Sequence, residues 1–245
     1  KGDRVFCHNR GAFVGACAEF CALESTNCNP LPDHVTFAQG AAVGVPYYTA
    51  YRAMFQKIGL KPAQRVLVHG ASGAVGLAAL QIGKASGMEM LGTAGTEEGL
   101  KLVKSHGASI AFNHREQDYA EKIMKYTNEE GVDGILEMLS NVNLAKDLEL
   151  LASNGSIAII GCRGPVKINP RDMMGKESKI IGVALATATN EEFAEMCAYV
   201  TAGLNTSILT PVIHREYPLS ETAQAHIDII ESKGAQGKLV INVTE

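Results

Sequence analysis

Apolar residues in the middle of the chain form short runs that alternate with longer stretches of helical periodicity. The run from Val66 to Val68 is rich in β-branched residues and predicts a buried parallel strand. A turn of small residues follows it and leads into an apolar, helix-like stretch, and this order then repeats. The predicted strands span 66–69, 88–93, 109–112, 133–138, 156–160 and 179–184, with helices between them over 74–86, 97–106, 118–127 and 142–152.

Strands joined by helical crossovers predict an α/β fold with a doubly wound parallel sheet built from two mononucleotide-binding halves. We expect this Rossmann domain over residues 40–184. The flanking segments 1–39 and 185–245 differ in pattern and are predicted to be two parts of one β-rich domain that the sheet domain splits. The other predicted elements are a β-like run over 16–22, helices over 47–58, 191–202 and 221–232, and a strand over 238–243.

Composition narrows the class of protein. A hydrophobic content of 46% with 20% charged residues is ordinary for a soluble globular chain, and the net charge of −4 gives no drive toward nucleic acid or anionic lipid. The sequence has neither a bilayer-spanning apolar run nor a signal-peptide pattern, so a cytoplasmic location is expected. The chain opens at Lys1 in what resembles the middle of a β-domain, so we expect a fragment that lacks an N-terminal part.

Six cysteines raise the question of a metal site or disulfides. Four of them, Cys7, Cys17, Cys21 and Cys28, lie near the start of the chain with no C-x-x-C pair among them. This spacing is not that of a standard zinc knuckle, so reduced thiols and no bound metal are expected.

Two glycines stand where the first predicted strand turns into its helix. Gly73 and Gly76, with Ala71, give the pattern A-x-x-G-x-x-G. A glycine has no Cβ to hold a phosphate away from the backbone, and the free N–H groups of the helix's first turn attract the pyrophosphate of a dinucleotide. The alternative is a tight turn without a ligand. The place of this turn in an alternation of six strands with helices favours the dinucleotide site.

The end of the second strand indicates which dinucleotide is bound. An NAD site usually has an acid there for the ribose hydroxyls, whereas this strand ends at Ala94 and Gly95. Because no acid repels a 2′-phosphate, NADPH is favoured. Lys101, His114 and Arg115 are nearby donors; a solvated surface position is the more natural interpretation of Lys101, and both interpretations stay open for the other two.

Polar residues also follow the fourth and fifth strands, whose carboxyl ends would face a bound ligand. They include Asn141, Asn143 and Arg163; either asparagine could instead cap the next helix. The sequence has no nucleophile elbow, zinc-protease motif or carboxylate pair at a meaningful spacing. This is consistent with hydride transfer, in which the cofactor carries the chemistry.

Several separate blocks of the sequence resemble the zeta-crystallin group, the NADPH:quinone oxidoreductases of the zinc-free medium-chain dehydrogenase/reductase family. The matching blocks are 68–76, 92–99, 112–116, 169–172 and 176–178. The resemblance implies a GroES-like catalytic domain with an inserted Rossmann domain, here partial because the family's N-terminal part is absent. It also implies NADPH-dependent reduction of quinones or enones without a metal, in one-electron or hydride steps, by a cytosolic homotetramer.

Carried over by position, the resemblance assigns cofactor contacts and no catalytic side chain. The contacts are Ser72, Gly73, Ala74, Val75, Gly76, Gly95, His114, Asn143, Ile160, Gly161, Cys162, Arg163, Val183, Ala184 and Leu185. Ala74 replaces a glycine that is frequent in the family. The group also contains lens crystallins and proteins that bind AU-rich RNA, so a non-catalytic, RNA-binding role that keeps the NADPH site is the alternative, although the sequence has no basic stripe or RNA motif.

Overall fold

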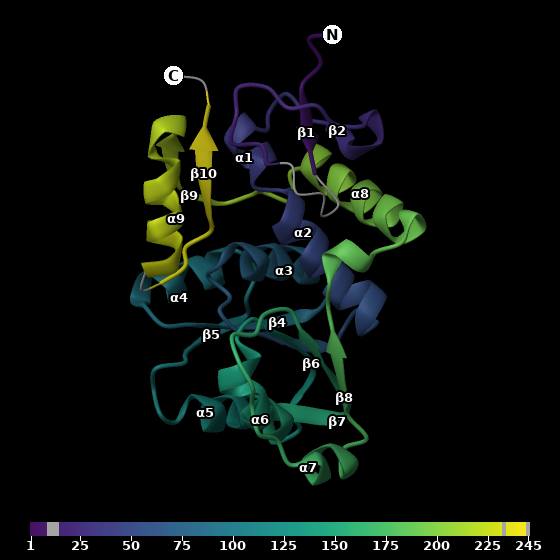
Figure 1. The fold of residues 1–245 in the computed structure, drawn as a ribbon. Helices are drawn as coiled ribbons and strands as arrows, with labels where there is room; N and C mark the ends of the chain where they lie inside the picture. The colour runs from purple at the N-terminus through teal and green to yellow at the C-terminus, as the bar shows by residue number, and fades with distance from the viewer. Residues whose placement is uncertain (9–14, 232–233, 244–245) are drawn as a thin grey trace.

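The computed structural model describes residues 1–8, 15–231 and 234–243 (Figure 1). The strands are β1 (Val5–Cys7), β2 (Cys28–Pro30), β3 (Arg65–Val68), β4 (Glu89–Ala94), β5 (Ile110–Asn113), β6 (Val132–Glu137), β7 (Leu151–Ile159), β8 (Lys179–Gly182), β9 (Ile213–Pro218) and β10 (Lys238–Asn242). The α-helices are α1 (Phe37–Ala41), α2 (Gly44–Tyr51), α3 (Ala74–Ala85), α4 (Glu97–Ser105), α5 (Tyr119–Tyr126), α6 (Ser140–Leu150), α7 (Pro170–Met174), α8 (Asn190–Asn205) and α9 (Thr222–Glu231). Short 3₁₀ turns span Ser25–Asn27, Leu185–Thr187 and Leu219–Glu221, and a π-helix spans Arg52–Lys57.

The central element is a six-stranded sheet in the order β5-β4-β3-β6-β7-β8, and every neighbouring pair in it is parallel. This is the strand order of the classic doubly wound sheet, so the predicted fold class is confirmed. Strand β3 pairs on both sides: Val68 lies opposite Gly92 of β4 and opposite Leu136 of β6. The order of the strands therefore reverses at β3, and a crevice forms at the carboxyl ends of β3 and β6.

The β3 side chains show how the sheet is covered on both faces. Val66, Leu67 and Val68 are all completely buried. Val66 and Val68 pack in one core cluster with residues of α2, α3 and α4, whereas Leu67 packs in the other with residues of α5 and α6. Burying such a side chain stabilises the fold by roughly 1.5–3 kcal/mol, which explains why this strand is apolar at every one of these positions.

The C-terminal segment docks onto the sheet domain through α8. The Arg52 guanidinium is 1% exposed and lies 2.7 Å from a carboxylate oxygen of Glu192. One turn further along α8, Glu195 accepts a hydrogen bond from the Tyr51 hydroxyl at 2.7 Å. These contacts join α2 and the π-helix to a helix about 140 residues later in the chain (Figure 1).

One prediction for the flanking segments is wrong, and several elements were not predicted. Residues 16–22 form no strand; all of them are exposed, so no neighbouring strand or core stabilises an extended conformation there. The strands β1 and β2 form an antiparallel pair and β9 and β10 a parallel pair, and in the described ranges these are separate two-stranded sheets. Strand β9 and the short helices α1 and α7 were not predicted. The predicted end of the helix at 232 lies outside the described residues.

Within the described ranges, the helices are all too short or too polar to cross a lipid bilayer.

Candidate cofactor site

The glycine turn joins β3 to α3 at the crevice. Gly73 is the N-cap of α3, with extended dihedral angles of φ −75° and ψ 167°. A Cβ on Gly76 would lie 2.5 Å from the Ala71 Cα, so only glycine lets α3 start this close to the end of β3. A Cβ on Gly73 would meet its nearest atom, the Gly70 carbonyl oxygen, at 3.4 Å, which is ordinary contact. The fold therefore requires Gly76, whereas Gly73 leaves space for a ligand.

A loop from the C-terminal segment lies against this turn. The Gly237 N–H donates to the Ser72 carbonyl oxygen at 2.8 Å, and Gly73 and Gly237 form an isolated parallel bridge. The Ala235 Cβ is 3.5 Å from the position that a Cβ on Gly73 would occupy. Residues remote in sequence thus form one wall of the candidate phosphate site.

A cavity of about 210 Å³ opens at the switch point. Its lining is His69, Gly70, Thr93, His114, Glu137, Met138, Leu139, Val142 and Asn143. The cavity brings together two predicted contacts, His114, which follows β5, and Asn143, which lies near the start of α6. Desolvation, followed by the nearby His69 and Arg115, holds the pKa of His114 below its ordinary value. Its imidazole is therefore neutral at pH 7.

Gly95 follows β4 and lies beneath the side chains that follow β5. A Cβ on Gly95 would be 2.7 Å from His114 Nε2 and 2.9 Å from Arg115 Nε. The acids just beyond, Glu97 and Glu98, occupy the first turn of α4 as predicted, and Lys101 is exposed on that helix. The end of β4 is thus free of acids and adjoins two nitrogen-bearing side chains.

The ends of the later strands carry the remaining predicted residues. Neither asparagine caps α6: the N-cap is Leu139, Asn141 Oδ1 accepts from the Arg163 N–H at 2.9 Å, and Asn143 donates to Glu137. Residues Ile160, Gly161, Cys162 and Arg163 follow β7, with Cys162 and Arg163 exposed. Val183, Ala184 and Leu185 follow β8 at the same edge of the sheet.

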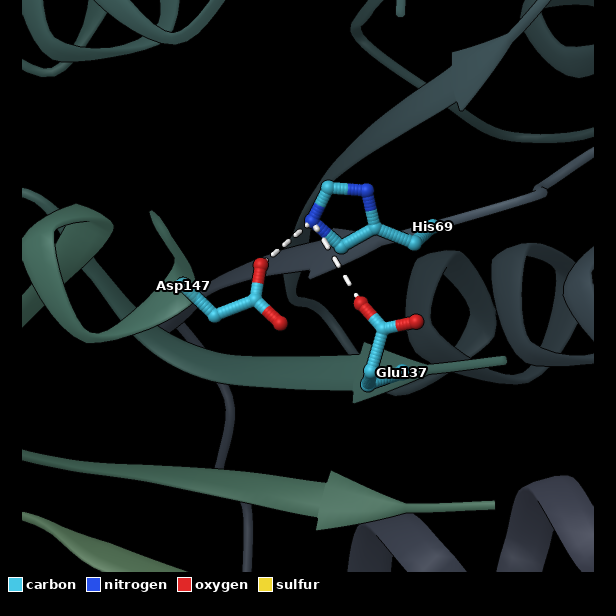
Figure 2. A group of neighbouring side chains, drawn as sticks. All are labelled: His69, Glu137 and Asp147. Atoms are coloured by element: carbon cyan, nitrogen blue, oxygen red, sulfur yellow. Dashed lines mark ion pairs between the residues drawn. The ribbon is translucent and has the colours of Figure 1, made fainter. Parts of the chain in front are cut away.

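Three buried ionisable side chains form a cluster at the cavity, with His69 and Glu137 in its lining, and their association was missed by the sequence analysis (Figure 2). His69 Nε2 is 2.9 Å from Asp147 Oδ1 and 3.8 Å from Glu137 Oε2. The side chains are 3% exposed for His69 and fully buried for both acids. The expectation that the chain has no meaningful carboxylate pair is therefore wrong. Glu137 ends β6 and Asp147 lies on α6, which packs against β6 and brings the two carboxyls together.

Burial has strong electrostatic consequences for this cluster. Desolvation raises the pKa of both Glu137 and Asp147 to about 7, and it lowers the pKa of His69. Asp147 Oδ1 faces His69 Nε2, and the Glu137 carboxyl adjoins both side chains. Two adjacent buried carboxylates cannot both ionise cheaply, which is consistent with their raised pKa values.

Comparison with known proteins identifies a matching family and similar proteins. A family profile described as zinc-binding dehydrogenase matches residues 74–202. Human quinone oxidoreductase is 51% identical over 241 residues, which are 98% of this chain and 73% of the human protein. The rat quinone oxidoreductase is 49% identical with the same coverage.

Solved structures show the same fold. The quinone oxidoreductase of Thermus thermophilus, described together with its NADPH complex, superposes with a TM-score of 0.83 at 27% identity, over 92% of this chain and 73% of that one. A mycobacterial protein complexed with NADPH gives a TM-score of 0.84 at 27% identity, over 93% and 72%.

The strand order and the glycine turn at the switch point define a dinucleotide-binding oxidoreductase of the doubly wound class. Within that class, the chain belongs to the zinc-binding dehydrogenase family, in its zeta-crystallin-like group of quinone oxidoreductases, as the sequence blocks predicted.

The family's description raises the question of zinc. Among the described residues, only His69, Glu137 and Asp147 form a group of three potential ligands, with their atoms within 4.8 Å of one another. The group has no thiolate, and Glu137 is already bonded to Leu139 and Asn143. Cys7 and Cys28 lie 3.3 Å apart without a third ligand in the described ranges. The described residues do not fit a cysteine-containing zinc site.

The two glycines of the turn should respond differently to substitution. We predict that Gly76→Ala lowers the free energy of unfolding by about 2–4 kcal/mol, because its Cβ overlaps the backbone of Ala71. Gly73→Ala should cost less than about 1 kcal/mol yet weaken dinucleotide binding, because a methyl group obstructs the phosphate. Chemical denaturation and cofactor titration measure both effects. Equal losses of stability in the two variants would contradict this division.

The buried acids should make stability depend on pH. The ordinary pKa of Asp147 is 3.8 and its folded-state value is about 7, so between these limits the unfolded chain releases a proton that the folded chain retains. Raising the pH from about 4 to about 7 therefore destabilises the fold through this group. We predict that, as the pH rises from about 4 to about 7, the unfolding free energy of Asp147→Asn increases relative to that of the wild type.

The control is Leu148→Ala on the same helix, a buried position without a titrating group. Its loss of stability should be the same at every pH. A difference for Asp147→Asn that is also constant with pH would show that Asp147 is not protonated in the folded state.

Proposed function

We propose that this chain is an NADPH-dependent quinone reductase that transfers reducing equivalents from the nicotinamide to quinones or related enones. The observation that carries the proposal is its 51% identity with human quinone oxidoreductase over 98% of the chain. The cavity at the switch point supports it, because open α/β sheets bind dinucleotides there.

The end of β4 supports NADPH over NADH. A 2′-phosphate beside Gly95 meets no carboxylate, and it lies within reach of the His114 and Arg115 side chains. The two NADPH-complexed structural neighbours are consistent with this choice. Residues of the glycine turn then hold the pyrophosphate, and Asn143 faces the part of the cofactor that enters the cavity.

The bound cofactor supplies the hydride or electrons, and the protein orients it. The residues after β7 and β8, namely 160–163 and 183–185, border the same crevice and restrict how the nicotinamide half lies. No side chain is needed as an acid or base in this proposal, since reduction of a quinone draws its protons from water.

The proposal is tested with the purified full-length protein, NADPH and an ortho-quinone. We expect quenching of NADPH fluorescence on mixing and consumption of NADPH that depends on the quinone. If the protein neither binds NADPH nor oxidises it, the proposed function is wrong.

Three further features rest on resemblance to the family alone. We infer that residues 1–39 and 185–245 belong to a GroES-like domain around the Rossmann domain 40–184, that the protein forms a homotetramer, and that it resides in the cytoplasm. Sedimentation analysis tests the proposed oligomeric state. The RNA-binding alternative predicts that NADPH displaces an AU-rich RNA from the chain, and the net charge of −4 does not favour it.

An acid at the end of β4 should reverse the cofactor preference. We predict that Gly95→Asp raises the Kd for NADPH at least about tenfold, because its carboxylate would pair with Arg115 and repel the 2′-phosphate. The Kd for NADH should change by less than about threefold. Gly95→Asn is the matched control, with the same size and no charge. Equal losses of the two cofactors in Gly95→Asp would show that the 2′-phosphate is not recognised here.

A further inference from the structure

One carboxylate in the cavity wall determines how a neighbouring asparagine is oriented. Asn143 Nδ2 donates to both oxygens of Glu137, at 3.2 and 3.3 Å. Glu137 also accepts from the Leu139 N–H, at the N-cap of α6. The end of β6 and the first turn of α6 are thus joined through this one buried side chain.

The chemistry of the pair leaves Asn143 with one orientation. Asn143 Nδ2 lies within hydrogen-bond distance of both Glu137 oxygens, and an ionised Glu137 only accepts hydrogen bonds, so the amide nitrogen faces Glu137. The amide oxygen then remains available to a ligand in the cavity, which Asn143 and Glu137 both line. Such an oxygen accepts from a ribose hydroxyl or from the amino group of adenine, and the adenosine half, whose 2′-phosphate we place near His114 in the same cavity wall, carries both donors.

The wider cluster explains how Glu137 remains in place at full burial. Asp147 adjoins Glu137 on one side, and its Oδ1 lies 2.9 Å from His69 Nε2. His69 adjoins both acids, and its Nδ1 is 3.3 Å from Thr93 Oγ1, which accepts from the Gly70 N–H at 3.2 Å. The network therefore links the ends of β3, β4 and β6 around the switch point.

We propose that Glu137 is a positioning residue for the cofactor: it holds the Asn143 amide with its oxygen turned into the cavity, where it accepts a hydrogen bond from the adenosine half of the dinucleotide. The inference rests on the proposed NADPH site and adds a determinant of cofactor geometry that has no contact with the reacting atoms. If Glu137 had only a structural role, its substitution would change the stability of the protein. The contribution of Asn143 to cofactor binding would then not depend on Glu137.

The test measures the Kd for NADPH of the full chain by fluorescence titration in a double-mutant cycle. Glu137→Met has a similar volume and no acceptor, so the Asn143 amide is free to turn. We expect the Kd to rise about tenfold, and Asn143→Ala to cause a similar rise. The double variant should be no weaker than either single one, because Glu137 acts through Asn143.

Two further variants separate positioning from folding. Glu137→Gln keeps an oxygen that accepts from Asn143, so we expect its Kd to stay within about threefold of the wild type. Gln81→Met is the matched control: Gln81 is also buried and bonded, to Tyr47 and Thr210, but lies outside the cavity lining. It should lower the unfolding temperature without changing the Kd.

The outcomes distinguish the two proposals. If the wild type does not bind NADPH, the proposed function fails. If the wild type binds and Glu137→Met binds equally well, or if the losses of Glu137→Met and Asn143→Ala simply add, the positioning role is wrong. Should Glu137→Met fail to fold, Glu137→Gln still decides: a loss as large as that of Asn143→Ala, in a variant that unfolds at the wild-type temperature, would overturn the proposal.

Discussion

The site depends on one constraint of chain topology. Strand β3 pairs with a parallel strand on each side; the chain adds β4 and β5 on one side of it and then β6, β7 and β8 on the other. The helices after β3 and β4 cover one face of the sheet, and those after β5 and β6 cover the other. Among the described elements, no helix fills the space above the carboxyl ends of β3 and β6, so a crevice remains there. The strand ends deliver His69, Thr93 and Glu137 to one place from positions scattered over about seventy residues.

Two physical devices operate in this crevice. At the glycine turn, Gly73 and Gly76 have no side chains, and the backbone N–H groups of α3 provide the positive potential for a phosphate. At the cavity, by contrast, the protein buries three ionisable side chains, His69, Glu137 and Asp147. Burying Glu137 and Asp147 costs stability at neutral pH, as their raised pKa values indicate. An apolar pair would pack there at lower cost, so the acids are better explained by the fixed hydrogen bonds that they provide at the site.

Much of the fold could be predicted from the sequence, because local pattern and burial agree in the sheet. Val66 to Val68 is apolar at every position since both faces of the strand are covered, and Gly76 is required by the close approach to Ala71. Residues 16–22 were predicted wrongly because β propensity without a partner strand is not enough. The buried cluster was missed because Glu137 and Asp147 are ten residues apart on different elements. The signal was the acid Glu137 directly after the apolar residues Ile135 and Leu136, at a strand end that in a doubly wound sheet faces the ligand crevice.

A crystal structure of the chain with NADPH bound tests the account most directly. We predict that the pyrophosphate lies at the N-terminus of α3 and that Asn143 Oδ1 accepts a hydrogen bond from the adenosine half while Nδ2 still donates to Glu137. A dinucleotide bound away from the switch point, or an Asn143 amide that contacts neither the cofactor nor Glu137, would contradict it.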